Sequence, residues 1–152
     1  MRTIVLALTA ALVLVAPAAA STAPKRSELA LVSQINIVRA QYGLGPLTLD
    51  SRLERAARAH SREMLTSNVF THGDFAARMF QFEVTGAVAG ENIAWGTGAR
   101  GSAQGIVLAW LASPEHRANL LRQSFTRVGV SDLVGTFQGY AGAHVVTADF
   151  AN

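Results

Sequence analysis

The sequence predicts an α+β domain with helices packed on a small antiparallel sheet. Two observations indicate this class. Apolar residues recur at helical spacing through most of the chain from Leu29 to Leu121. Nearer the C-terminus, the valine-rich segments Arg127 to Val134 and Ala141 to Phe150 flank the stretch Gly135 to Tyr140, which is typical of a β-hairpin. The expected order is helix, helix, short helix, loop, helix, helix, hairpin.

The N-terminal segment, residues 1–20, predicts a signal peptide that is not part of this domain. Arg2 precedes the apolar run Thr3 to Ala16, and the alanines before Ser21 have the small-residue form of a signal-peptidase site. We expect cleavage after Ala20. The run is shorter than the roughly 20 residues of a membrane span, so the mature protein is expected to be secreted or periplasmic, without stable membrane insertion.

Composition restricts the function classes. The chain of 152 residues carries 13 basic and 10 acidic side chains, a net charge of +3, which is too small a basic excess to indicate a nucleic-acid partner. It contains no cysteine, so stability is expected from core burial and not from disulfides. We expect a flexible lead-in over residues 21–27 and a single domain over residues 28–152.

The first two helices are predicted by apolar faces and by stop signals. One face of the first helix carries Leu29, Val32, Ile35, Val38 and Tyr42. The segment Gly43-Leu44-Gly45-Pro46 ends this helix, and Asp50 is a good N-cap for the next one. The stripe of the second helix consists of Leu53, Ala57, His60 and Met64.

The remaining helices follow from composition and capping residues. A short helix is expected from Phe75, and glycines at positions 86, 90, 96, 98 and 101 indicate a long loop-rich stretch after it. The run Ala103 to Ala112 is nearly all apolar and predicts a helix buried on several sides. We expect a last helix that extends to about Leu121. Ser113 is suited to its N-cap and Pro114 to its first position.

Three candidate functional residues come from separate segments that only the fold can bring together. His72 lies at a break in the chain, Glu91 lies in the stretch GENIAWG, interpreted as loop, and His116 lies in the first turn of the last helix. Two imidazoles and a carboxylate are suited to an open divalent-metal site or to general acid-base catalysis. Each residue also has a structural interpretation, as a turn residue, a carboxylate accepting amide protons, and a solvated helix residue.

Other polar and aromatic residues favour structural roles. His60 shares the apolar stripe of its helix and is expected to be a hydrogen-bonded core residue, and the same interpretation applies to His144. Ser113 is explained as a cap and Glu115 by the helix dipole. Aromatic residues could line a groove for an apolar ligand but are more often core; they are Trp95, Trp110, Phe75, Phe80 and Phe82.

Four motifs resemble those of the CAP superfamily, the secreted SCP-like domains, in its compact bacterial form. In order they are FTHGDF, GENIAWG, AWLASPEHRANLL and FTRVGVSDL, and the resemblance covers about Glu28 to Phe150. It implies an α-β-α sandwich with helices on both faces of a small antiparallel sheet.

The resemblance also implies a cleft with two histidines and two glutamates. His72 matches the first histidine, Glu91 the first glutamate and His116 the second histidine. The second glutamate is expected three residues after a tryptophan, where this chain has Ser113, with Glu115 two residues further on. The expected metal ligands are therefore His72 and His116, with Glu91 as a nearby carboxylate. Either the set of four is incomplete, which weakens any assignment of catalytic residues, or Glu115 substitutes from a different backbone position, so Ser113 and Glu115 are also expected at the cleft.

Three functions follow from this resemblance. The first is a binding module whose cleft takes zinc or another divalent cation, together with an envelope or extracellular ligand. Its affinity is expected to weaken as the pH falls through about 6.5, where imidazoles take up protons. The alternatives are a metal-assisted hydrolase or peptidase in which Glu91 moves a proton, and binding of a sterol or fatty acid in a groove lined by Phe75, Met79 and Phe80.

Overall fold

The computed structural model describes residues 23–152. The predicted signal peptide and its cleavage site lie outside the described residues. No helix among residues 23–152 is long and apolar enough to cross a membrane.

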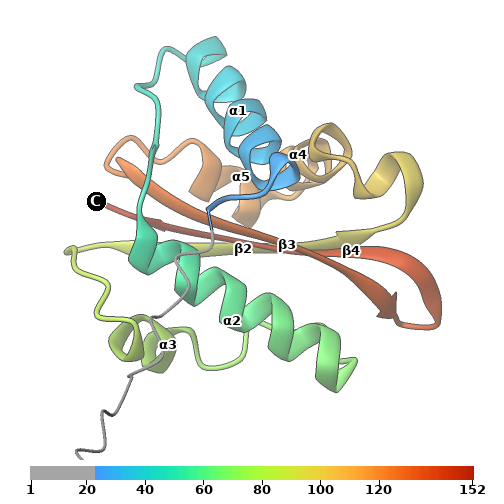
Figure 1. Ribbon diagram of the computed structural model, residues 1–152. Helices are drawn as coiled ribbons and strands as arrows, with labels where there is room; N and C mark the ends of the chain where they lie inside the picture. Colours follow the sequence, from blue (N-terminus) through green and yellow to red (C-terminus); the bar gives the residue numbers. More distant parts are fainter. Residues whose placement is uncertain (1–22) are drawn as a thin grey trace, which may run out of the picture.

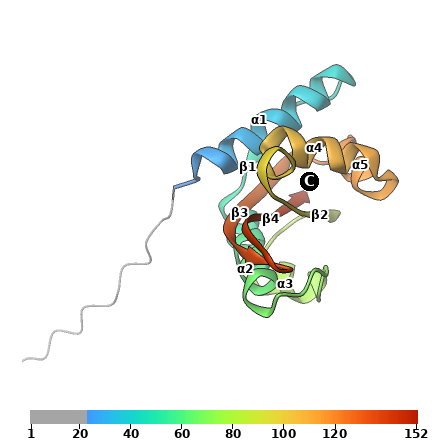
Figure 2. The same cartoon turned by 90° about the vertical axis from the view of Figure 1, so that its right-hand side faces the viewer.

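The described chain forms three layers, with a four-stranded sheet between two layers of helices (Figure 1, Figure 2). In chain order the elements are α1 Arg26–Gln41, β1 Thr48–Leu49, α2 Ser51–Ser67, α3 Phe75–Gln81, β2 Ala89–Gly96, a 3-10 turn Gly98–Gly101, α4 Ala103–Ala112, α5 Pro114–Leu120, β3 Arg127–Phe137 and β4 Tyr140–Ala151. Helices α1, α4 and α5 lie on one face of the sheet, and α2 and α3 lie on the other. The predicted α+β class and α-β-α sandwich are confirmed.

The strand order β1-β3-β4-β2 makes β2 an edge strand. Strands β2, β3 and β4 are antiparallel, as expected, whereas the short β1 pairs parallel to β3. The hairpin is longer than its valine-rich segments indicated, because only Gln138 and Gly139 separate its strands, both at positive φ (52° and 84°). Such two-residue turns match the twist of paired strands.

The interpretation of residues 86–101 as loop is wrong for the segment that contains Glu91, which is strand β2. Glycines at both ends of the strand hid it in the sequence. Gly90 is required by close packing, since a Cβ there would lie 2.8 Å from the side-chain oxygen of Asn119. A Cβ on Gly96 would likewise lie 2.8 Å from the backbone of Arg100.

The predicted apolar face of α1 is also partly wrong. Leu29 and Tyr42 are about half exposed, whereas Glu28 and Arg39 are buried. The physical reason is that these two charged side chains satisfy buried backbone groups. Glu28 accepts from the backbone N–H groups of Lys25 and Asp132, and Arg39 donates to four carbonyl oxygens, those of Gly45, Leu120, Arg122 and Phe125.

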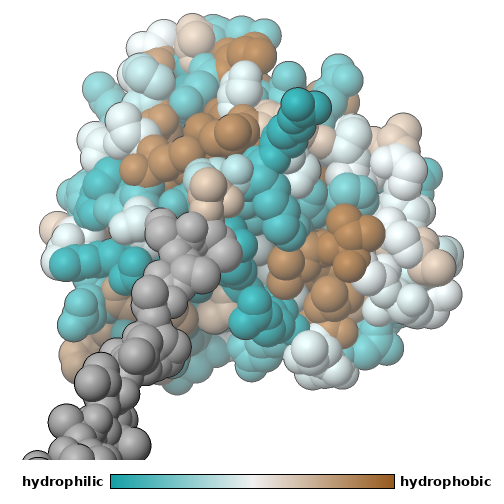
Figure 3. Space-filling model, in the orientation of Figure 1, coloured by the Kyte–Doolittle hydropathy of each residue, from teal (hydrophilic) through white to brown (hydrophobic). Residues whose placement is uncertain are grey.

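The core lies on both sides of the sheet. One cluster joins α1, α4 and α5 to the even-numbered residues of β4, including Ala148 and Phe150. Two smaller clusters join α2 and α3 to odd-numbered residues such as Val145 and Ala151. On the exposed face in Figure 3, apolar side chains form small separate groups among hydrophilic ones.

Candidate functional site

The two predicted cleft histidines meet near the edge strand β2. His72 lies in the segment between α2 and α3, on one side of the sheet, and His116 lies in α5, on the other side. Their ring centroids are 6.3 Å apart and their planes are inclined by 49°. Each helical layer therefore contributes one imidazole to the same small region.

His72 is oriented by Glu91. Its Nδ1 lies 2.6 Å from Glu91 Oε1, and because a carboxylate accepts, we assign the ring proton to Nδ1. The Nε2 lone pair is then free to bind a ligand. The His72 side chain is 53% exposed while that of Glu91 is only 3% exposed, so a buried carboxylate holds an accessible imidazole.

Arg78 of α3 provides the positive charge beside Glu91, and sequence reasoning missed it. Its Nη2 donates to Glu91 Oε2, and its Nη1 donates to the backbone carbonyl of His72 at 3.3 Å. The guanidinium is almost fully buried. The available signal was a single arginine in the otherwise apolar sequence FAARMF of a short helix.

His60 of α2 is confirmed as a hydrogen-bonded core histidine, and it supports the segment that carries His72. It is fully buried, and its Nε2 lies 2.8 Å from the backbone carbonyl of Thr71. Because a carbonyl only accepts, Nε2 carries the proton and Nδ1 accepts from Arg78 Nη1 at 3.0 Å. His60 therefore bonds the backbone carbonyl of Thr71 and Arg78 bonds that of His72, so that the two side chains fix the backbone of these two residues.

His116 is positioned through its backbone. The side-chain amide of Asn92, from β2, donates to the carbonyl oxygen of His116 at 2.9 Å. Asn119 of α5 donates to the backbone carbonyl of Glu91 and to the side-chain oxygen of Asn92, each at 3.0 Å. These amides tie α5 to the same strand that carries Glu91, and sequence reasoning missed both.

The environment of His116 disfavours its charged form. Burial lowers the pKa of the imidazole, the nearby His72 lowers it further, and Glu115 raises it. The neutral imidazole is the form that binds metal ions.

Ser113 and Glu115 lie at the start of α5 and contact each other. Ser113 is the N-cap residue and Pro114 takes the first helical position, as predicted, but the expected cap hydrogen bond is absent at this residue. Instead the Ser113 hydroxyl lies 3.3 Å from Glu115 Oε2. The Glu115 side chain, which is exposed, thus engages the hydroxyl that a cap would use.

His144 does not belong to the cluster of His72, Glu91 and His116, because it pairs with a different carboxylate. Its Nδ1 lies 2.9 Å from Asp132 Oδ1 on the neighbouring strand β3. It forms a second histidine and carboxylate pair, on the face of the sheet covered by α1 and α4. The predicted hydrogen bond is present, but the side chain is 30% exposed, so His144 is not a core residue.

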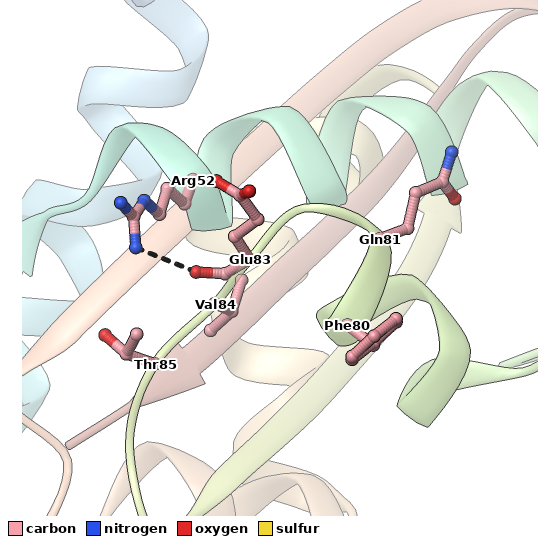
Figure 4. A pocket seen from close by; sticks show the side chains of 6 residues that line it. All are labelled: Arg52, Phe80, Gln81, Glu83, Val84 and Thr85. Atoms are coloured by element: carbon pink, nitrogen blue, oxygen red, sulfur yellow. Dashed lines mark hydrogen bonds between the residues drawn. The ribbon is translucent and has the colours of Figure 1, made fainter.

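Most of the aromatic residues considered for a groove belong to the core or pack against it. Trp110 is 1% exposed and Met79 is 8% exposed, and Phe75 and Phe82 pack on the cluster that contains Met79. Phe80 is 87% exposed. It borders an open hollow of about 700 Å³, shown in Figure 4, together with Arg52, Gln81, Glu83, Val84 and Thr85.

The imidazoles of His72 and His116 are the side chains at this edge of the sheet that could hold a metal ion. A zinc ion bonded tetrahedrally to two imidazoles at 2.0–2.1 Å would hold the ring centroids roughly 5 Å apart, so the 6.3 Å between His72 and His116 would have to shorten by about 1 Å. Among residues 23–152 no group of three or more histidine, cysteine, aspartate or glutamate side chains is arranged to hold a metal. Two imidazoles could hold a metal ion only in an open site in which water would occupy the other positions.

Comparison with known proteins identifies similar sequences. The profile of the Cysteine-rich secretory protein family, CAP, matches residues 32–150. The Uncharacterized protein YkwD of Bacillus subtilis (strain 168) is 36% identical over 120 residues, which are 76% of this chain and 44% of that protein. The chain therefore spans less than half the length of this relative.

Solved structures share the fold. An extracellular protein containing a SCP domain from Bacillus anthracis str. Ames superposes with a TM-score of 0.67 and 28% identity, over 83% of this chain and 40% of that one. An outer surface protein from Borrelia burgdorferi superposes with a TM-score of 0.71 and 22% identity, over 83% of this chain and 92% of that one. Manganese-bound Ac-ASP-7 superposes with a TM-score of 0.59 and 13% identity, over 89% of this chain and 73% of that one. The last two likenesses concern the fold alone.

Proposed function

The chain belongs to the Cysteine-rich secretory protein (CAP) family, and on this premise we propose that it is an exported binding module whose cleft takes a divalent cation such as zinc. The ligands would be His72 and His116. Glu91 would act beside them as the carboxylate that orients His72.

The observation that carries this proposal is the hydrogen bond between His72 Nδ1 and Glu91 Oε1. Histidines that ligate metals almost always donate their other ring N–H to a carboxylate, a carbonyl or water, which fixes the tautomer and raises ligand basicity. Here the carboxylate is buried and the imidazole is half exposed. A second imidazole, His116, faces the first, and imidazole nitrogen is a preferred ligand of zinc.

The same geometry favours binding over hydrolysis. A metal-assisted hydrolase needs a base that is free to take a proton from water. Glu91 is buried and engaged by both His72 and Arg78. The position of the second family glutamate holds Ser113, whose hydroxyl contacts Glu115. We therefore assign no catalytic residue.

Export is part of the proposal. The support is the signal-like sequence of residues 1–20 and the similarity to a protein described as extracellular. The site would then meet ligands of the cell envelope or the medium.

The test is a calorimetric zinc titration of the metal-free mature domain, residues 21–152, beside the variants His116→Ala and His144→Ala. The matched control is His144, which also bonds a buried carboxylate but belongs to a different pair. We expect saturable binding to the unmodified domain and to His144→Ala, and a loss of at least tenfold in affinity for His116→Ala, because one of two protein ligands is removed. Absent binding, or equal loss in both variants, would contradict the proposal.

A further inference from the structure

A buried carboxyl group, that of Asp149, lies beside Glu91 on the neighbouring strand. Asp149 in β4 is the direct cross-strand partner of Glu91 in β2. Side chains alternate along a strand, and both neighbours of Asp149 two positions away, Thr147 and Ala151, contact α2 or its cluster. Asp149 therefore faces the layer of α2 and α3, on the same side as Glu91.

The Asp149 carboxyl has no conventional partner. Its side chain is fully buried, and neither oxygen accepts a hydrogen bond from any residue between 23 and 152. A buried carboxylate without donors is among the most costly groups in a protein interior. A carboxylic acid needs only an acceptor for its O–H group.

The charges around Asp149 compensate one carboxylate, not two. Glu91 faces it from β2, and Arg78 of α3 and His60 of α2 reach the same Glu91 carboxylate. From β3 the opposite residue is Gly129, which has no side chain. The Nε2 proton of His60 goes to Thr71, so Arg78 is the cation available to this carboxyl pair in the described chain, and it bonds Glu91.

Glu91 can accept the missing hydrogen bond. An ionised carboxylate offers about four acceptor positions, of which His72 and Arg78 occupy one each. The pKa of Asp149 is raised well above its usual range, first by burial and then by the negative charge of Glu91, against the opposing effect of Arg78. Geometry and charge thus agree on which carboxyl holds the proton.

We propose that Asp149 is a carboxylic acid in the folded protein and donates a hydrogen bond to Glu91, which makes it a positioning residue for His72. Glu91 is then held from three directions, by α3, by β4 and by the imidazole itself. Its Oε1 stays aimed at His72 Nδ1, and the Nε2 lone pair stays available to a ligand. The role toward a metal rests on the proposed function, whereas the protonation state does not.

The first test measures protonation in the metal-free, unmodified mature domain, with Asp132 as internal reference. Asp132 is also buried, but it is paired with His144. The side-chain carboxyl ¹³C resonances of both residues are assigned through bonds and recorded by NMR across the neutral range. We expect Asp149 to show the shift of a protonated acid and Asp132 that of a carboxylate. An ionised Asp149 at neutral pH overturns the inference.

The second test separates positioning from simple packing. Asp149→Asn keeps a donor toward Glu91, whereas Asp149→Ala removes it. We expect zinc affinity within about twofold of the unmodified domain for Asp149→Asn and a loss of about tenfold for Asp149→Ala, the scale of lost outer-shell partners. In metal-free protein, ¹⁵N NMR should show the Nδ1–H tautomer of His72 in Asp149→Asn. In Asp149→Ala it should show a mixture of the Nδ1–H and Nε2–H tautomers.

Equal tautomer populations in the two variants would overturn the positioning role. If the unmodified domain binds no zinc, the proposed function fails, while the carboxyl and tautomer measurements still decide the role of Asp149. If Asp149→Ala does not fold, the carboxyl shift in the unmodified domain remains decisive.

Discussion

At the residue scale, the buried acid makes folding depend on pH in an unusual direction. The folded pKa of Asp149 lies above its ordinary value of 3.8. Its contribution to stability is therefore complete below about pH 3.8 and is lost as the pH rises toward the folded pKa, because folding must then take up a proton.

The variant Asp149→Asn isolates this effect. Relative to it, the free energy of unfolding of the unmodified domain should fall by about 1.4 kcal/mol per pH unit above the ordinary pKa of Asp149 and up to its raised folded value. Urea unfolding of both proteins at a series of pH values measures the difference. A difference that does not change with pH would show that Asp149 is ionised in the fold.

Residue types alone revealed only part of the site. The resemblance to the CAP motifs singled out His72, Glu91 and His116, and the fold brings all three to one region. Arg78, Asn92, Asn119 and Asp149 were missed because their roles depend on partners elsewhere in the chain. No local pattern indicates that Asp149 lies across from Glu91, since this depends on the pairing of β2 with β4.

At the element scale, the position of α2 is set by a glycine. A Cβ on Gly129 of β3 would lie 2.0 Å from the backbone carbon of Leu53 and 2.1 Å from the nitrogen of Glu54. The helix backbone therefore rests directly on the strand. This contact fixes how far α2, with His60, stands from the sheet.

Substituting Gly129 should displace the helix. We expect Gly129→Ala to lower the free energy of unfolding by about 3 kcal/mol, the upper part of the range for overpacking. Gly45→Ala is the control, since no heavy atom lies within 4 Å of the added Cβ, and it should change stability by less than about 0.5 kcal/mol. Denaturant unfolding checks both, and similar small effects would mean that α2 does not rest on Gly129.

Element prediction succeeded where periodicity or composition was distinctive and failed where packing overrode it. Helix α2 and the hairpin were predicted from regular patterns, and α4 from its almost wholly apolar composition. Strand β2 was missed because its end glycines are required by neighbouring side chains and backbone and not by a turn. The face of α1 was misjudged because Glu28 and Arg39 are buried to satisfy backbone groups, which a hydrophobic pattern does not reveal.

At the scale of the whole molecule, His72 and His116 come together because the two helical layers meet at the edge strand β2. One layer provides His72 with its support from His60 and Arg78, and the other provides His116 through α5. Both layers are hydrogen-bonded to β2. The His72 ring bonds the Glu91 carboxylate on one face of the sheet, and the Asn92 amide donates to the His116 carbonyl on the other. The 6.3 Å between the ring centroids is therefore a property of the sandwich.

The most direct measurement is anomalous diffraction from a crystal of the zinc-loaded mature domain. We expect one zinc ion bonded to Nε2 of His72 and to a ring nitrogen of His116, with Glu91 still on His72 Nδ1 and outside the metal's ligands. A zinc ion bonded directly by Glu91, one at His144, or no ordered zinc between His72 and His116 would contradict it.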